Sequence, residues 1–422
     1  MRIQMPIKDN PGCLALLALL LLVNSASAQL TVTGSGQQGS SLLTPTRMLK
    51  NVQLTNSGPE QLKAVNATDT LVVPYNPADP SLVSRVLVTD SNVLNGLTLD
   101  NWVCKTDSIC STVCGASLRL GFNDTEQVSL LVDNAHLAST VAPRRPIIAW
   151  SVNSGSLQTH QLGAAETSVL LASGVTNPII NLYIKGMSPF EDRYSGDVPP
   201  NSVKITGFVL DRGGSTMAVP QPGKVWLNIG DSIMSGDAAR YAAGQGRPAD
   251  DNWAASDDGR ASYGYLLAQH YGYREIRLAY GGYDWGGVAN LPALTTLIDQ
   301  KTSTMSRITN GFLNPIPDVV LINLGENGIP ALTSVSQALV KLRSRVNPAT
   351  KIIVMIPASG KGRAEITQAF GGYTNSTHDA RVFLVDLGQL TFATADGTHP
   401  TASGHESIYQ AALTVLDPII SK

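Results

Sequence analysis

Short apolar runs alternate with segments of helical pattern from Lys224 to the end of the chain, and this alternation constrains the fold more than any other feature. Alternation of this kind predicts a parallel sheet with helices on both faces. The predicted strands are 225–229, 276–280, 319–324, 352–356 and 382–387, and the predicted helices lie near 261–271, 290–308, 332–346, 362–370 and 403–416. Ligands bind such sheets beyond the carboxyl ends of the strands, so residues that follow the strands are the first candidates for a site.

The segment before this α/β pattern consists of short β-type runs separated by Gly, Asn, Ser and Pro. The runs are 70–73, 84–88, 117–122, 128–132, 147–152, 179–184 and 203–210. Because no amphipathic helix of ten residues interrupts them, the pattern predicts an all-β sandwich or jelly roll. Pro220, Pro222 and Gly223 indicate a linker. We therefore expect a β-sandwich domain over 29–221 and an α/β domain over 222–422.

The first 28 residues have the pattern of a secretory signal peptide. Arg2 and Lys8 precede an apolar stretch over 13–23, and the Ala-Ser-Ala at 26–28 resembles a signal-peptidase site. The alternative is a membrane anchor, but this stretch is shorter than the roughly 20 apolar residues that span a bilayer. We expect a secreted, extracellular protein without stable membrane insertion.

Charge and motif content exclude several classes of partner. The formal net charge is −2 and 15% of the residues are charged, so the chain lacks the basic field that nucleic acids require. No phosphate-cradling Gly-rich motif, His-Glu-x-x-His or Cys-x-x-Cys occurs in the sequence, so no cofactor or metal is expected. The partner is expected to be neutral or weakly charged.

Three cysteines follow the predicted cleavage site: Cys104, Cys110 and Cys114. In an oxidising compartment two of them are expected to close a small loop and leave one thiol, with the pairing undetermined. Metal binding is the alternative, but a fourth ligand is missing and no histidine is near in the sequence.

Two separated motifs together supply a serine, a base and an acid. The apolar run at 225–229 leads into Gly-Asp-Ser, which ends at Ser232, and far downstream Asp396 precedes His399 by three residues. A serine hydroxyl is a poor nucleophile until a base removes its proton, and an acid keeps the imidazole in the required tautomer. The combination indicates a hydrolase with Ser232 as nucleophile, His399 as base and Asp396 as the orienting acid.

Each of these residues also has an ordinary structural interpretation. Ser232 is a possible helix N-cap, and Asp396 is a possible turn residue in Asp-Gly. Among the other histidines, His405 is interpreted as a surface residue in the first turn of the last helix, and His378 as a residue of a polar loop.

Four motifs in this order resemble the SGNH hydrolases, also called GDSL-like esterases. Their blocks correspond to Gly-Asp-Ser at 230–232, a glycine after the second strand, Gly-Glu-Asn-Gly at 325–328, and Asp-x-x-His at 396–399. For the second block Gly282 is the better match and Gly281 the competitor. In the third block the family's aspartate is replaced by Gly328, which affects the hydrogen bonding of the loop. The resemblance implies a flavodoxin-like three-layer fold.

The resemblance also implies an oxyanion hole. Its donors would be the backbone N–H groups of Ser232 and Gly282 and the side-chain amide of Asn327. The alternative for Asn327 is an ordinary loop asparagine. Asp231 is expected to shape the turn, and Glu326 is expected to be exposed. In some two-domain relatives a backbone carbonyl replaces the acid, and this is the alternative to a catalytic role for Asp396.

A β-sandwich followed by this hydrolase domain resembles the two-domain carbohydrate esterases of family two. The supporting residues are 203–208, 210–211 and the Gly-Gly-Tyr-Asp-Trp at 281–285. This resemblance implies a carbohydrate acetylesterase that removes O-acetyl groups from a polysaccharide. Trp285 is expected either to contact the substrate or to pack beneath its loop. The alternatives are an esterase for short acyl or lipid esters and a catalytically silent carbohydrate-binding protein.

Overall fold

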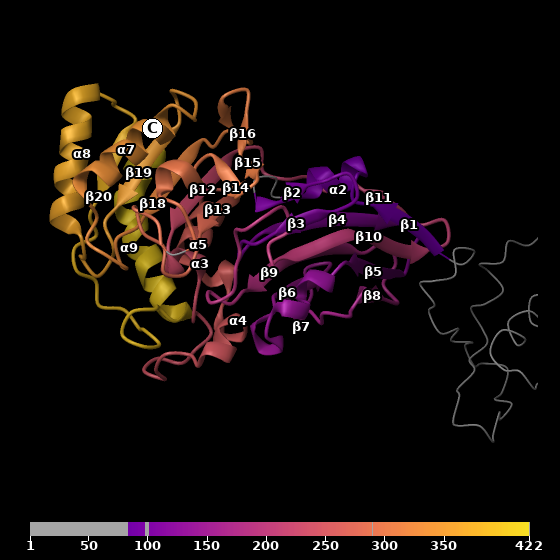
Figure 1. The fold of residues 1–422 in the computed structure, drawn as a ribbon. Helices are drawn as coiled ribbons and strands as arrows, with labels where there is room; N and C mark the ends of the chain where they lie inside the picture. Colours follow the sequence, from indigo (N-terminus) through magenta and orange to yellow (C-terminus); the bar gives the residue numbers. More distant parts are fainter. Residues whose placement is uncertain (1–82, 98–100, 289, 422) are drawn as a thin grey trace, which may run out of the picture. The chain divides into compact units, whose positions relative to one another are not determined.

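The computed structural model describes residues 83–97, 101–288 and 290–421. The predicted signal peptide at 1–28 and the predicted strand at 70–73 lie outside them. Within the described residues the chain forms two antiparallel sheets and then a parallel sheet that is flanked by helices (Figure 1). No helix in this part of the chain is long and apolar enough to cross a membrane.

Five parallel strands form the sheet that carries the candidate site. Its order is β13-β12-β18-β19-β20, which is the strand order of flavodoxin-like sheets. The predicted parallel sheet is confirmed, and each predicted run overlaps one strand. The strands are β12 (Val225–Gly230), β13 (Arg274–Ala279), β18 (Val319–Asn323), β19 (Lys351–Met355) and β20 (Val382–Val385).

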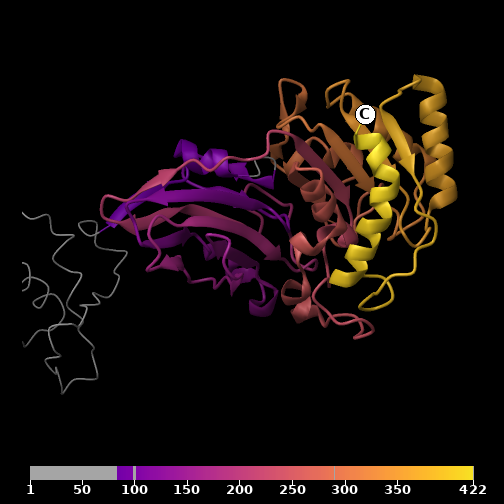
Figure 2. The same ribbon diagram turned by 180° about the vertical axis from the view of Figure 1, so that it is seen from behind.

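Alternating side chains of these strands enter two separate cores, one on each face. Leu227 and Ile229 of β12 pack in the core with α6 (Leu294–Leu297), α7 (Leu332–Arg343) and α8 (Arg363–Thr377). Trp226, on the opposite face, packs with α3 (Ser232–Ser235), α5 (Tyr263–His270) and α9 (Ala402–Ile420). Figure 2 shows α9, in yellow, in front of the sheet. The sheet is therefore covered on both faces, as is usual for buried parallel strands.

The predicted helix over 290–308 is wrong. The described part of this segment contains only the short helix α6, and the chain then forms two hairpins. They consist of β14 (Gln300–Thr302) with β15 (Met305–Ser306), and β16 (Ile308–Thr309) with β17 (Phe312–Leu313). The apolar spacing up to Ile298 is helical, but the Thr-Ser-Thr at 302–304 favours a turn because its hydroxyls compete for backbone groups.

Two antiparallel sheets occupy the described residues before the parallel sheet. One has the order β2-β3-β10-β5-β8 with β1 also paired to β10, and the other has the order β11-β4-β9-β6-β7. They share one apolar core, in which Phe122 and Phe208 of opposite sheets lie 5.5 Å apart between ring centroids. The strands are β1 (Val83–Leu87), β2 (Val103–Cys104), β3 (Ile109–Ser111), β4 (Ser117–Asn123), β5 (Gln127–Val132), β6 (Ile147–Val152), β7 (Gln158–Gln161), β8 (Ser168–Ser173), β9 (Ile179–Gly186), β10 (Val203–Asp211) and β11 (Ser215–Met217). The described helices among them are short: the α-helix α2 (Ser91–Gly96) and the 3-10 helices Ala135–Ser139 and Ala142–Arg144.

The expected local disulfide is absent from the structure, in which Cys104, Cys110 and Cys114 are all free thiols. Cys104 pairs with Ile109 across the β2–β3 ladder, and Cys110 pairs with Val103. Because successive side chains of a strand point to opposite faces, the thiols of Cys104 and Cys110 are directed apart. Burial raises the pKa of the Cys110 thiol to about 11 and that of Cys114 to about 12, so both are protonated at neutral pH.

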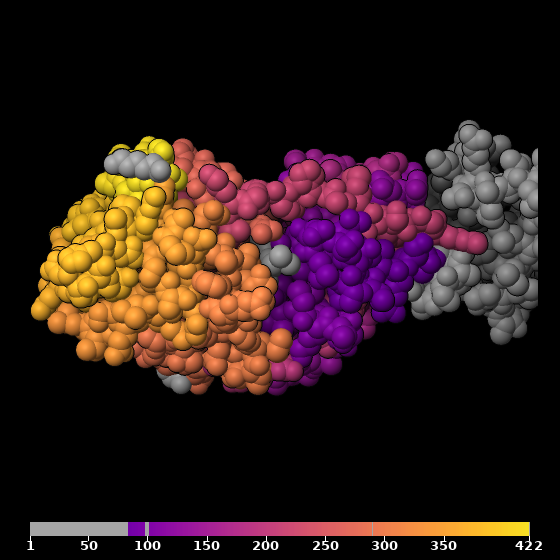
Figure 3. Space-filling view, turned by 90° about the horizontal axis from the view of Figure 1, so that it is seen from above, coloured from indigo at the N-terminus to yellow at the C-terminus, as the bar shows by residue number. Residues whose placement is uncertain are grey.

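A buried arginine connects the antiparallel sheets to the parallel sheet. Arg277 of β13 is fully buried and donates to the carbonyls of Ser235 and Gly259 at 3.2 and 2.9 Å. Its backbone N–H donates to Asn101 Oδ1, and a Cβ at Gly115 would lie 3.1 Å from its guanidinium carbon. Figure 3 shows purple residues of the first part next to orange residues near 300, where Lys301 Nζ donates to the Trp102 carbonyl at 2.9 Å.

Candidate active site

Ser232 lies at the carboxyl end of β12, in a sharp turn between strand and helix. Asp231 caps α3, its Oδ1 accepting from the N–H of Ile233 at 3.0 Å. A Cβ at Gly230 would lie 2.3 Å from the Cβ of Met234, so the turn needs glycine at this position. Ser232 is therefore the first residue of α3 and is 4% exposed. The N-cap is Asp231, so the N-cap interpretation of Ser232 is wrong.

The structure brings Ser232, His399 and Asp396 together across 167 residues of sequence. His399 Nε2 lies 3.0 Å from Ser232 Oγ, and His399 Nδ1 lies 2.8 Å from Asp396 Oδ2. The other oxygen of Asp396 accepts from the backbone N–H of His399 at 2.8 Å. With the Nδ1 proton on the Asp396 side, Nε2 has a lone pair available for the hydroxyl proton of Ser232.

The turn from Asp396 to His399 is fixed by its own backbone. The N–H of Ala395 donates to the carbonyl of His399 at 2.8 Å, and Gly397 adopts a φ of 90°, which favours glycine. Desolvation raises the pKa of Asp396, but hydrogen bonds from the backbone and ring of His399 outweigh it, and the pKa lies below its usual range. The carboxylate is therefore ionised at neutral pH and able to stabilise an imidazolium.

His405 and His378 take no part in the hydrogen bonds that join Ser232, His399 and Asp396. His405 is fully buried, and its Nδ1 accepts from the N–H of Tyr263 at 3.4 Å, so its interpretation as a surface residue is wrong. Burial lowers the pKa of His405 to about 3, and it is neutral at ordinary pH. His378 is exposed and ends α8.

The loops that carry the two other predicted oxyanion donors flank Ser232. Gly230 is in register with Ala279 of β13 on one side and with Asn323 of β18 on the other, so Gly282 and Asn327 follow the strands that neighbour β12. Asn327 is exposed, and its Nδ2 donates to the carbonyl of Tyr283 at 3.0 Å. This bond joins the two loops and leaves one of the two Nδ2 hydrogens available.

Gly281 and Gly282 meet different requirements. A Cβ at Gly281 would lie 2.6 Å from the Cβ of Pro189 and 2.8 Å from Asp237 Oδ2, so close packing requires glycine there. Gly282 has open space around it but adopts a φ of 73°, a conformation that other residues rarely adopt. Gly282 is exposed and Gly281 is half-buried.

The departure at Gly328 has a physical explanation. A Cβ at this position would lie 2.7 Å from Asp284 Oδ2, so the carboxylate of Asp284 occupies the space into which a side chain at 328 would extend. Asp284 Oδ1 accepts from the N–H of Trp285 at 2.6 Å, and burial raises the pKa of Asp284. The loop at 325–328 thus has a carboxylate beside it, that of Asp284, which belongs to the loop after β13. Sequence reasoning missed Asp284 because the two loops are distant in the chain.

Trp285 does not contact solvent, so its predicted role in substrate binding is wrong. The indole is 1% exposed, lies in the core with α6 and α7, and donates from Nε1 to the carbonyl of Leu324 at 3.1 Å. The alternative interpretation, an indole packed beneath its loop, describes the structure.

Glu326 is partly buried rather than exposed. Its Oε2 accepts from Ser359 Oγ at 2.6 Å, and its carbonyl accepts from Lys361 Nζ at 2.5 Å. These bonds fix the backbone that leads into Asn327.

An aromatic residue that sequence reasoning missed packs on the imidazole. Trp253 of α4 (Trp253–Ser256) lies 5.2 Å from His399 between ring centroids, with an interplanar angle of 79°. It precedes no strand and belongs to no motif, and its segment, between α3 and α5, is polar in sequence. No sequence signal identifies this contact.

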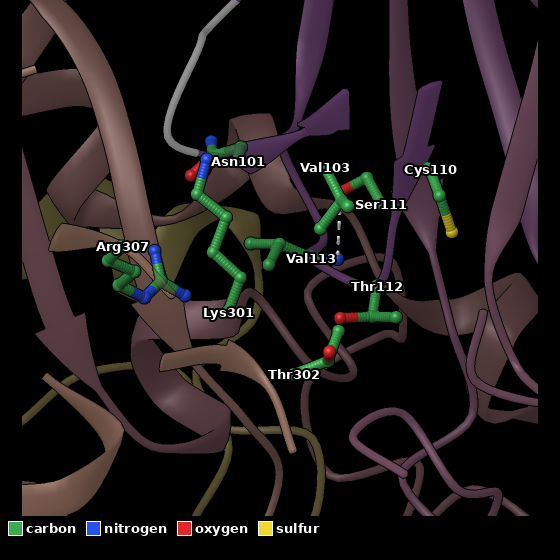
Figure 4. Close-up of a pocket in the computed structure, with 9 residues that line it drawn as sticks. All are labelled: Asn101, Val103, Cys110, Ser111, Thr112, Val113, Lys301, Thr302 and Arg307. Carbon is green, nitrogen blue, oxygen red and sulfur yellow. Dashed lines mark hydrogen bonds between the residues drawn. The ribbon is translucent and has the colours of Figure 1, made fainter. Parts of the chain in front are cut away.

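One cavity, of about 30 Å³, is lined by residues that include Ile233, Thr398 and Phe392, and this volume is large enough for an ordered water molecule. Another, of about 10 Å³, is lined by none of the predicted site residues and lies among Lys301, Arg307 and residues of β2 and β3 (Figure 4). Among the described residues, no cluster of three His, Cys, Asp or Glu side chains is arranged to hold a metal.

Comparisons with known proteins identify relatives of the fold only. No protein-family model matches the sequence, and no curated protein matches it. Among solved structures, a family two carbohydrate esterase from Cellvibrio japonicus aligns with a TM-score of 0.62 and 17% identity, over 82% of this chain and 97% of that chain. The acetyl xylan esterase Est2A from Butyrivibrio proteoclasticus aligns with a TM-score of 0.63 and 16% identity, over 81% and 99%.

A third solved structure, a family two carbohydrate esterase from Clostridium thermocellum in complex with cellohexaose, aligns with a TM-score of 0.60 and 16% identity, over 76% of this chain and 98% of that chain. The class that the fold defines is a three-layer α/β arrangement like that of these esterases, with the candidate serine at the carboxyl edge of the parallel sheet. Within this class the chain resembles the family two carbohydrate esterases.

Proposed function

We propose that this protein is a secreted serine esterase that hydrolyses O-acyl esters on a polysaccharide, and that the acyl group is acetyl. The observation that carries the proposal is the line of hydrogen bonds from Ser232 Oγ through the His399 ring to Asp396, with lengths of 3.0 and 2.8 Å. The resemblance in fold to carbohydrate esterases supports the substrate class.

In this proposal His399 Nε2 removes the proton of Ser232 as its oxygen attacks the ester carbonyl. The N–H groups of Ser232 and Gly282 and the Asn327 amide stabilise the developing oxyanion. The imidazolium then gives its proton to the sugar oxygen as the tetrahedral intermediate collapses and the bond from the acyl carbon to that oxygen breaks, which leaves an acyl-serine and a free sugar hydroxyl. A water molecule, activated by the same base, releases the carboxylic acid and restores the serine.

We further infer the domain organisation expected from the sequence: a signal peptide at 1–28, a β-sandwich of jelly-roll type at 29–221 and an SGNH hydrolase domain at 222–422. Support for the sandwich comes from the two antiparallel sheets that share one core. Support for secretion comes from the sequence of the first 28 residues.

The substrate is tested by measuring acetate release from acetylated xylan, acetylated mannan and acetylated cello-oligosaccharides beside a long-chain acyl ester. We expect rapid release of acetate from at least one glycan and slow hydrolysis of the long-chain ester. Preference for the long-chain ester would favour a lipid esterase. Binding of glycans without any hydrolysis would favour a catalytically silent binding protein.

A further inference from the structure

Trp253 limits where the imidazole of His399 can lie. The two rings meet edge to face at 5.2 Å, and the indole packs with Ala238 and Ala395, which adjoin the loops of Ser232 and Asp396. Trp253 is 3% exposed, so neighbouring residues cover the indole and a substrate does not reach it. An aromatic ring fixed in this way restricts rotation of the imidazole between Asp396 and Ser232.

The helix that carries Trp253 is too short to be stable by itself. α4 has four residues, Trp253–Ser256. The first turn of a helix loses more conformational entropy than its one hydrogen bond recovers, and a helix this short has no further turns to compensate for that loss. Its position therefore depends on partners outside the helix.

A lysine of the antiparallel sheets is a polar partner of α4. Lys185 of β9 donates from Nζ to the carbonyls of Ala255 and Asp257 at 2.8 and 2.5 Å. Carbonyls at the carboxyl end of a helix lack intrahelical donors, and a cation there is favourable for the helix dipole. Lys185 is 9% exposed, and its ammonium is thus a buried cap of α4.

The backbone and side chains next to Lys185 reinforce this contact. A Cβ at Gly186 would lie 2.1 Å from the carbonyl oxygen of Ala254, so β9 and α4 approach more closely than any side chain permits. Phe190 meets Trp253 edge to face at 6.1 Å, and Arg144 donates to Asp251 at 2.8 Å. The segment before α4 is therefore attached to the first part of the chain as well.

We propose that Trp253 is a positioning residue for His399 and that Lys185 acts on the catalytic base through Trp253. On this account the antiparallel sheets are part of the apparatus that places the base, and not a separable binding module. The inference rests on the proposed function, because it assigns His399 as the base.

The first test compares Trp253→Ala and Trp253→Phe with the full-length protein on a small chromogenic acetate ester. Misplacement of a reacting group by about 1 Å can cost on the order of 100-fold in rate. We expect Trp253→Ala to lower kcat by about tenfold or more while KM changes less than about threefold, and Trp253→Phe to recover much of the loss because a ring remains. A change confined to KM, or a folded Trp253→Ala with kcat within about threefold of wild type, would overturn the proposal.

The second test uses Lys185→Met, which keeps the length of the side chain and removes the cap. Its matched control is Lys204→Met on β10, a lysine of the same sheets that pairs with Asp133 away from α4. We expect kcat to fall in Lys185→Met and to stay unchanged in Lys204→Met. Equal losses in both variants would mean that any destabilised sheet lowers activity, which contradicts the proposal.

A double variant separates action through Trp253 from independent effects. If Lys185 acts through Trp253, Lys185→Met combined with Trp253→Ala has the same kcat as Trp253→Ala alone, whereas independent effects multiply. The rate at which a fluorophosphonate inactivates each variant checks the Ser232–His399 pair without a glycan. If Ser232→Ala is inactive but Trp253→Ala is as active as wild type, only this inference fails. Retained activity in Ser232→Ala would contradict the proposed function itself.

Discussion

At the scale of single residues, the candidate site depends on close contacts between the loops that follow β13 and β18. Gly328 lacks a side chain because the carboxylate of Asp284 occupies that space, and Asn327 bonds to the neighbouring Tyr283 carbonyl. The loop that departs from the family's pattern is thus held by a residue of the adjacent loop. Asn327 consequently stays beside the carboxyl end of β12.

The amide of Asn327 is expected to serve the transition state. We predict that Asn327→Ala lowers kcat by about 100-fold or more and changes KM little, since a donor to an oxyanion is worth about 3 kcal/mol. Steady-state kinetics on an acetate ester measure both constants. An effect mainly on KM would assign the amide to substrate binding, and a normal kcat would leave it as a loop residue.

The carboxylate of Asp396 is expected to orient the base. In Asp396→Asn one of the two carboxylate oxygens becomes an NH2 group, so the side chain cannot accept hydrogen bonds from both the ring Nδ1–H and the backbone N–H of His399. We therefore expect kcat to fall strongly, by at most as much as in His399→Ala. Both variants are measured on one substrate. Full activity of Asp396→Asn would show that a backbone carbonyl holds the imidazole instead.

At the scale of elements, the turn from β12 into α3 depends on a buried acid. Asp231 caps the first helical turn, and burial raises its pKa to about 7, with a smaller contribution from the charge of Glu326. Between pH 4 and 7 the folded state therefore keeps a proton that the unfolded state loses, so this group makes the free energy of unfolding fall as pH rises.

Asp231→Asn removes that pH dependence. We predict that the variant gains stability relative to wild type as pH rises from about 4 to 7, by an amount on the order of a few kcal/mol, since one pKa unit is worth about 1.4 kcal/mol. Urea unfolding of both proteins at several pH values provides the comparison. A stability difference that does not vary with pH would show that Asp231 is ionised in the folded protein throughout this range.

The strands that carry the site were predictable from sequence, while some helices and contacts were not. The run Val225–Gly230 is buried throughout and mostly apolar, with Asn228 as its polar exception, because both faces of the strand are covered, and such a run identifies a central parallel strand. The 290–308 segment has helical apolar spacing up to Ile298, yet the chain forms hairpins from Gln300 onward, where Thr-Ser-Thr at 302–304 favours a turn. For Trp285, sequence offered substrate contact or packing equally, and only its burial against Leu324 decides between them.

The contacts among Ser232, His399 and Asp396 were predictable because the three residues belong to two short motifs whose chemistry and spacing are local. Trp253 and Lys185 were not, because their effect on His399 depends on how β9, α4 and the Asp396–His399 turn meet in space. His405 illustrates the same limit, since its neighbours Tyr263 and Arg277 come from α5 and β13. A pattern along the chain does not contain these distances.

At the scale of the described molecule, the antiparallel and parallel sheets share buried polar contacts rather than a simple linker. Arg277 donates to the carbonyl of Ser235, at the end of the helix that begins with Ser232, and its side chain packs beneath Gly115. Tyr183 of β9 donates to Asp258, and Lys185 caps α4. The loops of Ser232 and His399 are thus both supported by residues that contact, or belong to, the first part of the chain.

The central claim is that Ser232 is the nucleophile of an esterase. The most direct measurement is acetate release from an acetylated glycan by Ser232→Ala and wild type, with circular dichroism to show that both are folded. We predict that the variant loses activity by roughly a thousandfold or more, because only binding and oxyanion stabilisation remain. A folded Ser232→Ala protein that keeps more than about a tenth of the wild-type rate would contradict the account.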